Sequence, residues 1–284
     1  MVSYIYSWSQ RKVWSSGRLE VVLTEEARNN RVVFLTGAGL SADSGVPTFR
    51  GEGGLYRGRV VEDIVSRRGF DQQPSLVHEF CDERRVALAS VAPNPAHFMI
   101  SRISTDYGDR AVVMTQNIDD LLERAECENA IHLHGFLTRM RSIGNSKVVR
   151  DIGHRRYWSG EESNAPSDGF KFRCPQSKSL FRPDVVLFGE LAPEYSKMHT
   201  ALKRLRRDDL LVVIGTLGNV LPVAEFAENA PCRTILNNLE PSEYIPESAF
   251  DDIFYDRASV VADPLETIIR TALGPANEST PPGL

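Results

Sequence analysis

Two glycines, Gly37 and Gly39, are the residues of this sequence that most clearly predict chemistry, because they directly follow the apolar run 32–35. The run has the composition of a parallel strand that is buried on both faces. Glycines at this point let the backbone pass close to a pyrophosphate, and residues 40–44 can begin a helix whose free N–H groups favour an anion. With Ala42 they match the G-x-G-x-x-[GA] pattern of dinucleotide sites. The turn predicts a nucleotide-phosphate site, and a tight strand-to-helix turn without a ligand is the alternative.

Two further segments carry polar side chains of the types that active sites use. His132 and His134 are two residues apart, so an extended chain would place both imidazoles on one face. Such a pair can bind a metal, but no carboxylate or thiol lies at ligand spacing in the sequence, which favours a core or hydrogen-bonded role for His132. Asn117 and Asp119 follow the apolar run 111–114, where these residue types either cap a helix or belong to an active site.

Composition limits the class of protein. The chain has 284 residues, of which 42% are hydrophobic, and a formal net charge of −5. It is long enough for a full core and suits one domain, or one domain with an insertion. The negative charge argues against a nucleic-acid binder. No apolar run reaches the ~18 to 20 residues that span a bilayer, and no signal-peptide core is visible, so we expect a cytoplasmic protein without a membrane partner.

The cysteines form no pattern that predicts a disulfide framework or a metal site. They lie far apart and include no C-x-x-C pair; they are Cys81, Cys127, Cys174 and Cys232. We expect buried or simply reduced thiols, as in a reducing compartment.

Apolar strand candidates alternate with helical stretches along most of the chain. The strand candidates are residues 32–35, 111–114, 185–188, 210–214 and 234–236. The helical stretches are residues 118–125, 194–206 and 222–228. This alternation predicts an α/β fold with a Rossmann-like parallel sheet and helices on both faces.

Two stretches interrupt the alternation and predict a small second module. Residues 51–93 have the pattern of helices inserted after the first phosphate loop, and residues 136–182 are polar and short of core residues. The module should cover the carboxyl edge of the sheet and leave a ligand cleft between. We expect a catalytic domain over residues 19–273, a disordered tail at 274–284, and an extension at 1–18 that is poorly ordered, packed on a partner or a transit peptide.

Several separated motifs, in one order, resemble those of the sirtuin family of NAD-dependent protein deacylases. They are GAGLSADSGVPTFRG at 37–51, TQNID at 115–119 and HLHG at 132–135, followed by matching segments at 183–190, 213–216 and 238–241. The resemblance covers about residues 30 to 270. It implies a Rossmann-like fold, NAD as cofactor and acylated proteins as substrates.

The resemblance also implies roles for individual residues. His134 would be the general base that deprotonates the nicotinamide ribose, Asn117 would hold the ribose and an ordered water, and Asp119 would lie beside the ribose and favour an oxocarbenium-like transition state. The cofactor-binding positions would be Gly37, Ala38, Gly39, Ser41, Phe49, Arg50, Gln116, Gly215, Thr216, Asn238 and Glu240.

Substrate positions follow from the same resemblance. A segment that pairs with substrate peptide would include Val186, Phe188, Gly189 and Glu190. Arg84 occupies the position where desuccinylating relatives place an arginine that grips an acyl carboxylate. Those relatives carry a tyrosine three residues earlier, where this chain has Cys81. We expect succinyl- or malonyl-lysine to be processed at least as well as acetyl-lysine, and an exposed helix charge is the alternative for Arg84.

The largest departure from the family concerns zinc. Sirtuins carry two close pairs of cysteines as zinc ligands between the HG and FGE motifs, but residues 136–182 contain only Cys174, with Ser142 near the first ligand position. One thiolate cannot make that site, so we expect no metal. The module would then be held by aromatic side chains, which include Tyr157, Trp158, Phe170, Phe172 and Phe181, or remain mobile.

The motifs favour a protein lysine deacylase that yields nicotinamide and O-acyl-ADP-ribose. The alternative is an NAD glycohydrolase or ADP-ribosyltransferase, since zinc-poor chains of this kind can serve that chemistry. A non-catalytic NAD sensor would have no need for Asn117, Asp119 and His134 together. The sequence does not specify the oligomeric state.

Overall fold

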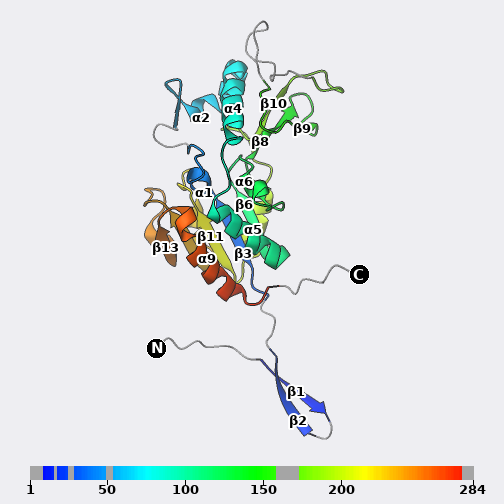
Figure 1. The fold of residues 1–284 in the computed structure, drawn as a ribbon, viewed down its shortest axis with the longest axis vertical. Helices are drawn as coiled ribbons and strands as arrows, with labels where there is room; N and C mark the ends of the chain where they lie inside the picture. The colour runs from blue at the N-terminus through cyan, green and yellow to red at the C-terminus, as the bar shows by residue number, and fades with distance from the viewer. Residues whose placement is uncertain (1–8, 16–17, 25–28, 49–53, 158–172, 277–284) are drawn as a thin grey trace.

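A parallel sheet forms the centre of the fold. The computed structural model describes residues 9–15, 18–24, 29–48, 54–157 and 173–276. Within these residues, six parallel strands are ordered β13-β12-β11-β3-β6-β7 (Figure 1). The strands are β3 (Val32–Thr36), β6 (Ala111–Thr115), β7 (Ile131–His132), β11 (Leu210–Ile214), β12 (Arg233–Asn238) and β13 (Asp252–Tyr255). This confirms the predicted Rossmann-like sheet.

The position of each strand in the sheet explains which ones the sequence predicts. β3 lies between β11 and β6, and all residues of β3 and β11 are buried. Strands covered on both faces read as continuous apolar runs, and the runs at 32–35, 111–114, 210–214 and 234–236 are confirmed as strands. The edge strands β7 and β13 are absent from the prediction because they are short and include residues that are polar or partly exposed.

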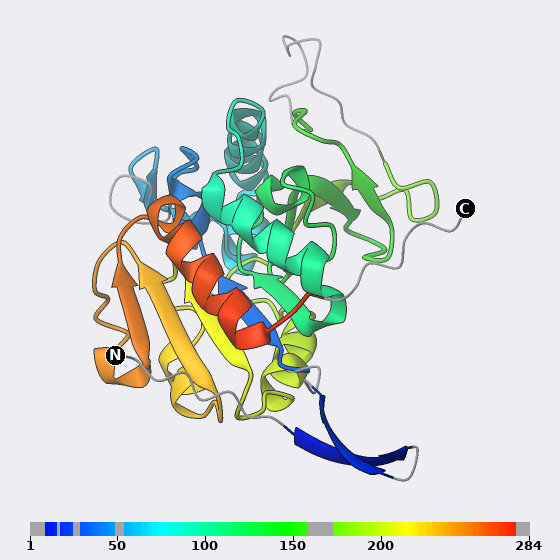
Figure 2. The same ribbon diagram turned by 60° about the horizontal axis from the view of Figure 1, so that its bottom comes forward.

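Helices cover both faces of the sheet. On one face α5 (Pro95–Tyr107) and α9 (Ala258–Leu273) lie side by side and bury a shared apolar core (Figure 2). On the other face α7 (Tyr195–Lys203) and α8 (Val223–Glu228) confirm two predicted helices. The predicted helix 118–125 is shorter in the structure, where only α6 (Leu121–Arg124) is helical.

The two insertions fold into one module beyond the end of the sheet where α1 (Gly39–Ala42) begins (Figure 1). Residues of the first insertion form α2 (Val61–Ile64), α3 (Arg67–Gln72) and α4 (Pro74–Leu88), together with the short strands β4 (Leu55–Tyr56) and β5 (Arg59–Val60). The second contributes an antiparallel sheet ordered β10-β8-β9, made of β8 (Gly135–Ser142), β9 (Val149–Asp151) and β10 (Phe181–Val185). The predicted second module is therefore present.

The apolar run 185–188 is not a strand of the parallel sheet, contrary to the sequence prediction. Strand β10 ends at Val185 and runs antiparallel to β8. After it the chain turns: the Val186 N–H donates to the His134 carbonyl at 2.9 Å, and the Phe188 N–H donates to the Val65 carbonyl at 3.0 Å. The run is apolar because Val185 and Leu187 are buried against α2, α3 and α4, and composition does not distinguish this burial from that of a sheet strand.

Aromatic packing contributes to the core of the small module, as predicted for two of the five residues. Tyr157 and Phe181 are fully buried with Met140 and Cys174, and the Phe181 N–H donates to the Tyr157 hydroxyl at 3.0 Å. The other three predicted residues lie outside the described residues; they are Trp158, Phe170 and Phe172.

Where the resemblance implies zinc ligands, the module holds a cluster of hydroxyl groups. The Ser179 hydroxyl lies 2.7 Å from that of Ser177 and 3.0 Å from that of Ser142, and it accepts the Gly144 N–H at 2.9 Å. Hydroxyls bonded to one another and one cysteine, Cys174, do not supply the four thiolate or imidazole donors that a tetrahedral zinc site requires. Among the described residues, no group of three or more His, Cys, Asp or Glu side chains could hold a metal ion.

A buried ion pair joins the two halves of the module. Asp82 and Arg85, both on α4, form this pair and are fully buried. The Arg85 Nε donates to the Leu137 carbonyl on β8 at 2.5 Å, and Asp82 accepts the Tyr157 N–H at 3.0 Å. Because both charged side chains also hydrogen-bond to the second insertion, they fix the position of α4 relative to the antiparallel sheet.

The remaining elements lie near the termini and in loops. An antiparallel hairpin consists of β1 (Ser9–Ser15) and β2 (Arg18–Thr24). Two turns of 3₁₀ helix lie at Gly108–Arg110 and Glu247–Ala249. No helix among the described residues combines the length and the apolar composition of a membrane span.

Replacement of Arg85 by methionine should lower the free energy of unfolding by about 3 to 5 kcal/mol, because Asp82 would stay buried without its counter-charge. Chemical denaturation of the wild type and the variant measures this loss. The double variant Asp82→Leu/Arg85→Met should recover much of it, since no buried charge would remain unpaired.

The matched control is Arg57→Met, which removes an exposed arginine that pairs with Glu79 at 2.7 Å. Its effect on unfolding should be far smaller, because solvent screens an exposed pair. An Arg85→Met loss no larger than that of Arg57→Met would contradict a stabilising role for the buried pair.

The donor set also predicts that the purified protein holds no stoichiometric zinc and keeps its fold in a strong chelator. Elemental analysis and thermal unfolding with and without EDTA measure both. One zinc atom per chain, or unfolding on chelation, would contradict this expectation.

Candidate active site

Two glycine turns meet at the carboxyl ends of neighbouring strands β3 and β11. The Gly39 N–H donates to the Gly215 carbonyl at 2.8 Å, and the Gly37 N–H donates to the Ile214 carbonyl at 2.9 Å. A Cβ on Gly215, whose φ is +66°, would lie 2.4 Å from the Leu40 nitrogen. No side chain fits there, so the backbone itself forms the surface at the start of α1, as a phosphate site requires.

Asn117 is buried and fixed at three points. Its backbone N–H donates to the Thr115 hydroxyl at 3.0 Å, and its side-chain Nδ2 donates to the Ser41 hydroxyl at 3.1 Å. Its carbonyl accepts a hydrogen bond from the His132 Nδ1 at 2.9 Å. These contacts leave the side-chain Oδ1 free of described partners and keep the loop after β6 against α1.

His97 extends this network, and its position was not predicted by the sequence. Its Nδ1 accepts the Asn94 N–H at 3.2 Å in the cap of α5, so its Nε2 carries the proton and donates to the Ser41 hydroxyl at 3.3 Å. Burial lowers the pKa of His97 to about 4, so the ring is neutral at physiological pH.

The Asp119 carboxylate accepts a hydrogen bond from the Ser41 hydroxyl, which itself accepts from Asn117 and His97. Burial raises the pKa of Asp119, while hydrogen bonds from the Leu121 N–H and from the Ser41 hydroxyl lower it. The Leu121 N–H, at the first residue of α6, donates to Asp119 at 3.2 Å, so Asp119 satisfies a donor at the helix start and also faces the Ser41 network. The two interpretations of Asp119 from the sequence, cap and site residue, are therefore compatible in space.

His132 has the hydrogen-bonded role that the sequence favours. Its Nε2 lies 2.8 Å from a Glu123 carboxylate oxygen, and the side chain is 1% exposed. Its ring stacks on Phe136 at 3.9 Å between centroids, and the Arg139 guanidinium lies 3.7 Å from the Phe136 centroid on that ring.

His134 presents a nitrogen that can accept a proton. Its Nδ1 donates to the Gln116 carbonyl at 3.0 Å, so in the neutral ring the Nε2 carries the lone pair. The hydroxyl of Tyr195 lies 2.9 Å from that Nε2. Burial lowers the pKa of His134, while the hydrogen bond to Gln116 raises it by a smaller amount. Tyr195 had no motif in the sequence to mark it.

Most of the predicted cofactor positions converge on this edge. The Gln116 side-chain amide lies 3.3 Å from the Thr216 hydroxyl. Thr216 and Asn238 exchange two hydrogen bonds, of 3.0 and 2.9 Å. Ala38 lies half-buried at the start of α1, and Glu240 is exposed after β12. The remaining two positions, Phe49 and Arg50, lie outside the described residues.

The predicted substrate segment is a turn that Glu190 holds in shape. The Glu190 carboxylate accepts two hydrogen bonds from Arg182, at 2.6 and 2.8 Å, and the Leu187 N–H at 3.1 Å. Its oxygens therefore point into the protein, where they hold the turn in place and do not face the solvent. Phe188 is 41% exposed, and Gly189 has a φ of +86° at the end of the turn.

Arg84 lies half-buried on α4, with its guanidinium 5.2 Å from the centroid of the Phe80 ring. Among the described residues, no carboxylate lies within ion-pair distance of Arg84. Cys81 is fully buried in the module core, where burial raises the pKa of the thiol to about 12. Cys81 is therefore a core residue, and within the described part of the chain the charge of Arg84 has no ion-pair partner.

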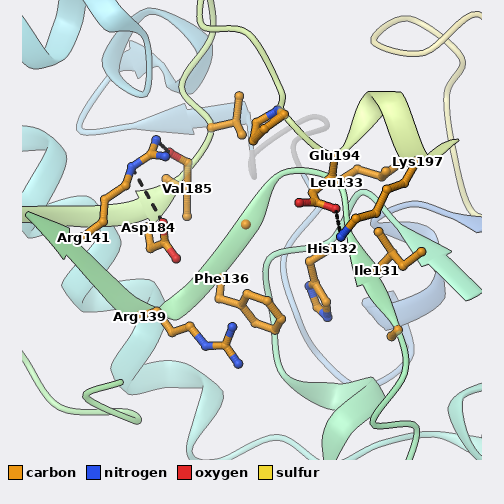
Figure 3. Close-up of a pocket in the computed structure, with 14 residues that line it drawn as sticks. Ile131, His132, Leu133, Phe136, Arg139, Arg141, Asp184, Val185, Glu194 and Lys197 are labelled. Atoms are coloured by element: carbon orange, nitrogen blue, oxygen red, sulfur yellow. Dashed lines mark hydrogen bonds and ion pairs between the residues drawn. The ribbon is translucent and has the colours of Figure 1, made fainter. Parts of the chain in front are cut away.

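A cavity of about 330 Å³ lies beside His134, between the small module and α7. Figure 3 shows the Arg141–Asp184 ion pair on one side and the Lys197–Glu194 pair on the other, with Phe136 between and below them in this view. Leu133 and Gly135, on either side of His134 in the chain, also line it.

Comparisons with known proteins agree with this arrangement. The Sir2 family matches residues 37–222. The NAD-dependent protein deacylase of Pasteurella multocida (strain Pm70) is 38% identical over 234 residues, which is 81% of this chain and 93% of the relative. The NAD-dependent protein deacylase of Escherichia coli (strain K12) is 37% identical over 255 residues, covering 88% and 86%. A solved structure of a Sir2 homolog–NAD complex is 30% identical, with a TM-score of 0.69 over 86% of this chain and 91% of the other. The chain therefore belongs to the Sir2 family, the sirtuins that its motifs resemble.

Proposed function

We propose that this protein is an NAD-dependent protein lysine deacylase that transfers the acyl group to ADP-ribose. The observation that carries the proposal is the hydrogen bond that the His134 Nδ1 donates to the Gln116 carbonyl, because it leaves the Nε2 of the neutral ring with the lone pair that can accept a proton. The two relatives named NAD-dependent protein deacylase, at 37 to 38% identity over most of the chain, support the same activity.

The residues at the carboxyl edge fit NAD. The contact between the turns of Gly39 and Gly215 leaves no room for a side chain there, so a pyrophosphate could approach the backbone closely. Thr216 and Asn238, with exposed Glu240 nearby in the chain, would hold the adenosine end. NAD would supply an ADP-ribosyl group whose C1′ takes the acyl oxygen as nicotinamide leaves.

The chain's own residues would orient the sugar and move one proton. His134, neutral because burial lowers its pKa, would accept a proton at Nε2 from a ribose hydroxyl. Asn117, fixed by Ser41 and His132, would present its amide oxygen to the ribose. Asp119 would favour positive charge that develops at the sugar.

Substrate peptide would bind along the turn after β10. The Phe188 backbone is already bonded on one side to residues 65–67, with its N–H donating to Val65 and its carbonyl accepting from Arg67 at 2.8 Å. Gly189, with its positive φ, would offer backbone groups for β-augmentation by an extended peptide. Arg84 would meet a carboxylate at the end of an acidic acyl chain.

The experiment that tests this function is incubation with NAD and a panel of acetyl-, succinyl- and malonyl-lysine peptides, followed by mass spectrometry. The expected products are deacylated peptide, nicotinamide and O-acyl-ADP-ribose. Free ADP-ribose formed at the same rate without peptide would instead support an NAD glycohydrolase.

His134→Ala should reduce peptide-dependent turnover by roughly 10²-fold or more and leave NAD affinity nearly intact, because a general base acts in the transition state. Steady-state kinetics and calorimetric NAD titration measure the two effects. The control is His199→Ala, which removes an exposed histidine on α7. Near wild-type turnover by the His134 variant would remove His134 from the mechanism.

Arg84→Met should selectively slow the reactions of succinyl and malonyl peptides, by about 1.5 to 3 kcal/mol in kcat/KM if charge-assisted hydrogen bonds form. Acetyl peptide should be nearly unaffected because it carries no acyl carboxylate. Arg68→Met, at an exposed position on α3, is the matched control. Equal losses on acetyl and succinyl peptides, or no loss on either, would show that Arg84 does not read the acyl group.

A further inference from the structure

Tyr195 occupies the one nitrogen that the proposed base needs. It is the first residue of α7, and its hydroxyl lies 2.9 Å from the His134 Nε2. The two rings are tilted by 54°, with centroids 5.8 Å apart. Among the described residues, His134 is the one hydrogen-bond partner of this hydroxyl.

The direction of this hydrogen bond follows from the other side of the ring. The Gln116 carbonyl can only accept, so the His134 Nδ1 must carry the proton. In the neutral ring the Nε2 can then only accept, and the Tyr195 O–H must donate to it. Burial raises the pKa of Tyr195, so the phenol keeps its proton at physiological pH.

We propose that Tyr195 is a positioning residue for His134: its hydroxyl holds the imidazole in the neutral, Nδ1-protonated form in the free enzyme and gives way to the ribose hydroxyl when substrate binds. This inference rests on the proposed function of His134 as the base. It assigns to Tyr195 no contact with the substrate.

The physical effect is a preference for one protonation state. A proton on Nε2 would make that nitrogen a donor, so the imidazolium form would lose the hydrogen bond from Tyr195. Loss of a hydrogen bond specific to the neutral form disfavours protonation, in addition to the burial that already lowers the pKa of His134.

The charged groups around the pair are largely paired with one another. On α7, Lys197 pairs with the preceding Glu194 at 2.7 Å. From the small module, Arg141 lies 3.7 Å from Asp184. The third neighbour is His132 at the end of β7, whose ring hydrogen-bonds to the Glu123 carboxylate and to the Asn117 carbonyl.

The cavity described above borders the chain on both sides of this hydrogen bond. Pro193 and Glu194, which directly precede Tyr195, line the cavity of about 330 Å³ together with Leu133 and Gly135, which flank His134 (Figure 3).

The direct test is an NMR titration of the His134 imidazole in the full chain without NAD, with the signal assigned by its loss in His134→Gln. In Tyr195→Phe the pKa of His134 should rise by about 0.5 to 1 unit, since one neutral hydrogen bond is removed and the ring is kept. Tyr244→Phe, which alters a half-exposed tyrosine, is the control and should leave the pKa unchanged. An unchanged pKa in Tyr195→Phe would overturn the proposal.

A second variant covers the case in which Tyr195→Phe does not fold. Replacement of Tyr195 by 3-fluorotyrosine keeps the shape and makes the hydroxyl a stronger donor, so the pKa of His134 should fall. A rise or no change would contradict the proposed hydrogen bond. Both titrations are independent of turnover, so they decide the role of Tyr195 even if the protein proves not to be a deacylase.

Kinetics then separate positioning from direct catalysis. The acid limb of kcat/KM, which reports the free enzyme, should move to higher pH in Tyr195→Phe by the shift seen in the titration. The acid limb of kcat, which reports the complex, should stay in place because the ribose hydroxyl has replaced the tyrosine. A kcat lowered 10²-fold at all pH values would overturn positioning in favour of direct participation.

Discussion

Backbone contact between two glycine turns sets the geometry of the whole carboxyl edge. Because β3 and β11 are neighbours, the approach of Gly39 to Gly215 fixes where α1 begins. That start point decides where Ser41 meets Asn117, and Asn117 in turn carries the loop from which Gln116 reaches His134. The surface offered to an anion and the orientation of the base thus depend on one contact from which side chains are excluded.

Hydrogen bonds from the ring nitrogens of three histidines hold the loop after β6 in place. His97 acts through the Ser41 hydroxyl, His132 through the Asn117 carbonyl and His134 through the Gln116 carbonyl. In a buried site each of these bonds is stronger than in water, and an unmatched polar group would be costly. The donor and acceptor at each ring nitrogen are therefore as important for the site as the imidazoles themselves.

The sequence predicted what local pattern determines and missed what the fold brings together. Central strands such as β3 are continuous apolar runs, and the glycine turn follows directly, so both could be predicted from the sequence. The run 185–188 misled because burial in the small module produces the same composition as burial in a sheet. His97 and Tyr195 lie far along the chain from their partners, since Tyr195 is 61 positions after His134, and no spacing rule connects them. Only the packing of α5 and α7 against the sheet does so.

The hydroxyl cluster in the small module has a consequence for the conditions under which the protein keeps its shape. Zinc held by thiolates is released when oxidants convert the sulfur ligands to sulfenic acids or disulfides. Serine hydroxyls do not undergo these reactions. The single cysteine between residues 136 and 182 is the buried Cys174, and hydrogen bonds from Ser142 and Ser177 lower the pKa of its thiol to about 6. Hydroxyl hydrogen bonds thus stand where metal–sulfur bonds would stand in a thiolate-zinc module, and this cluster offers an oxidant no such bond to break.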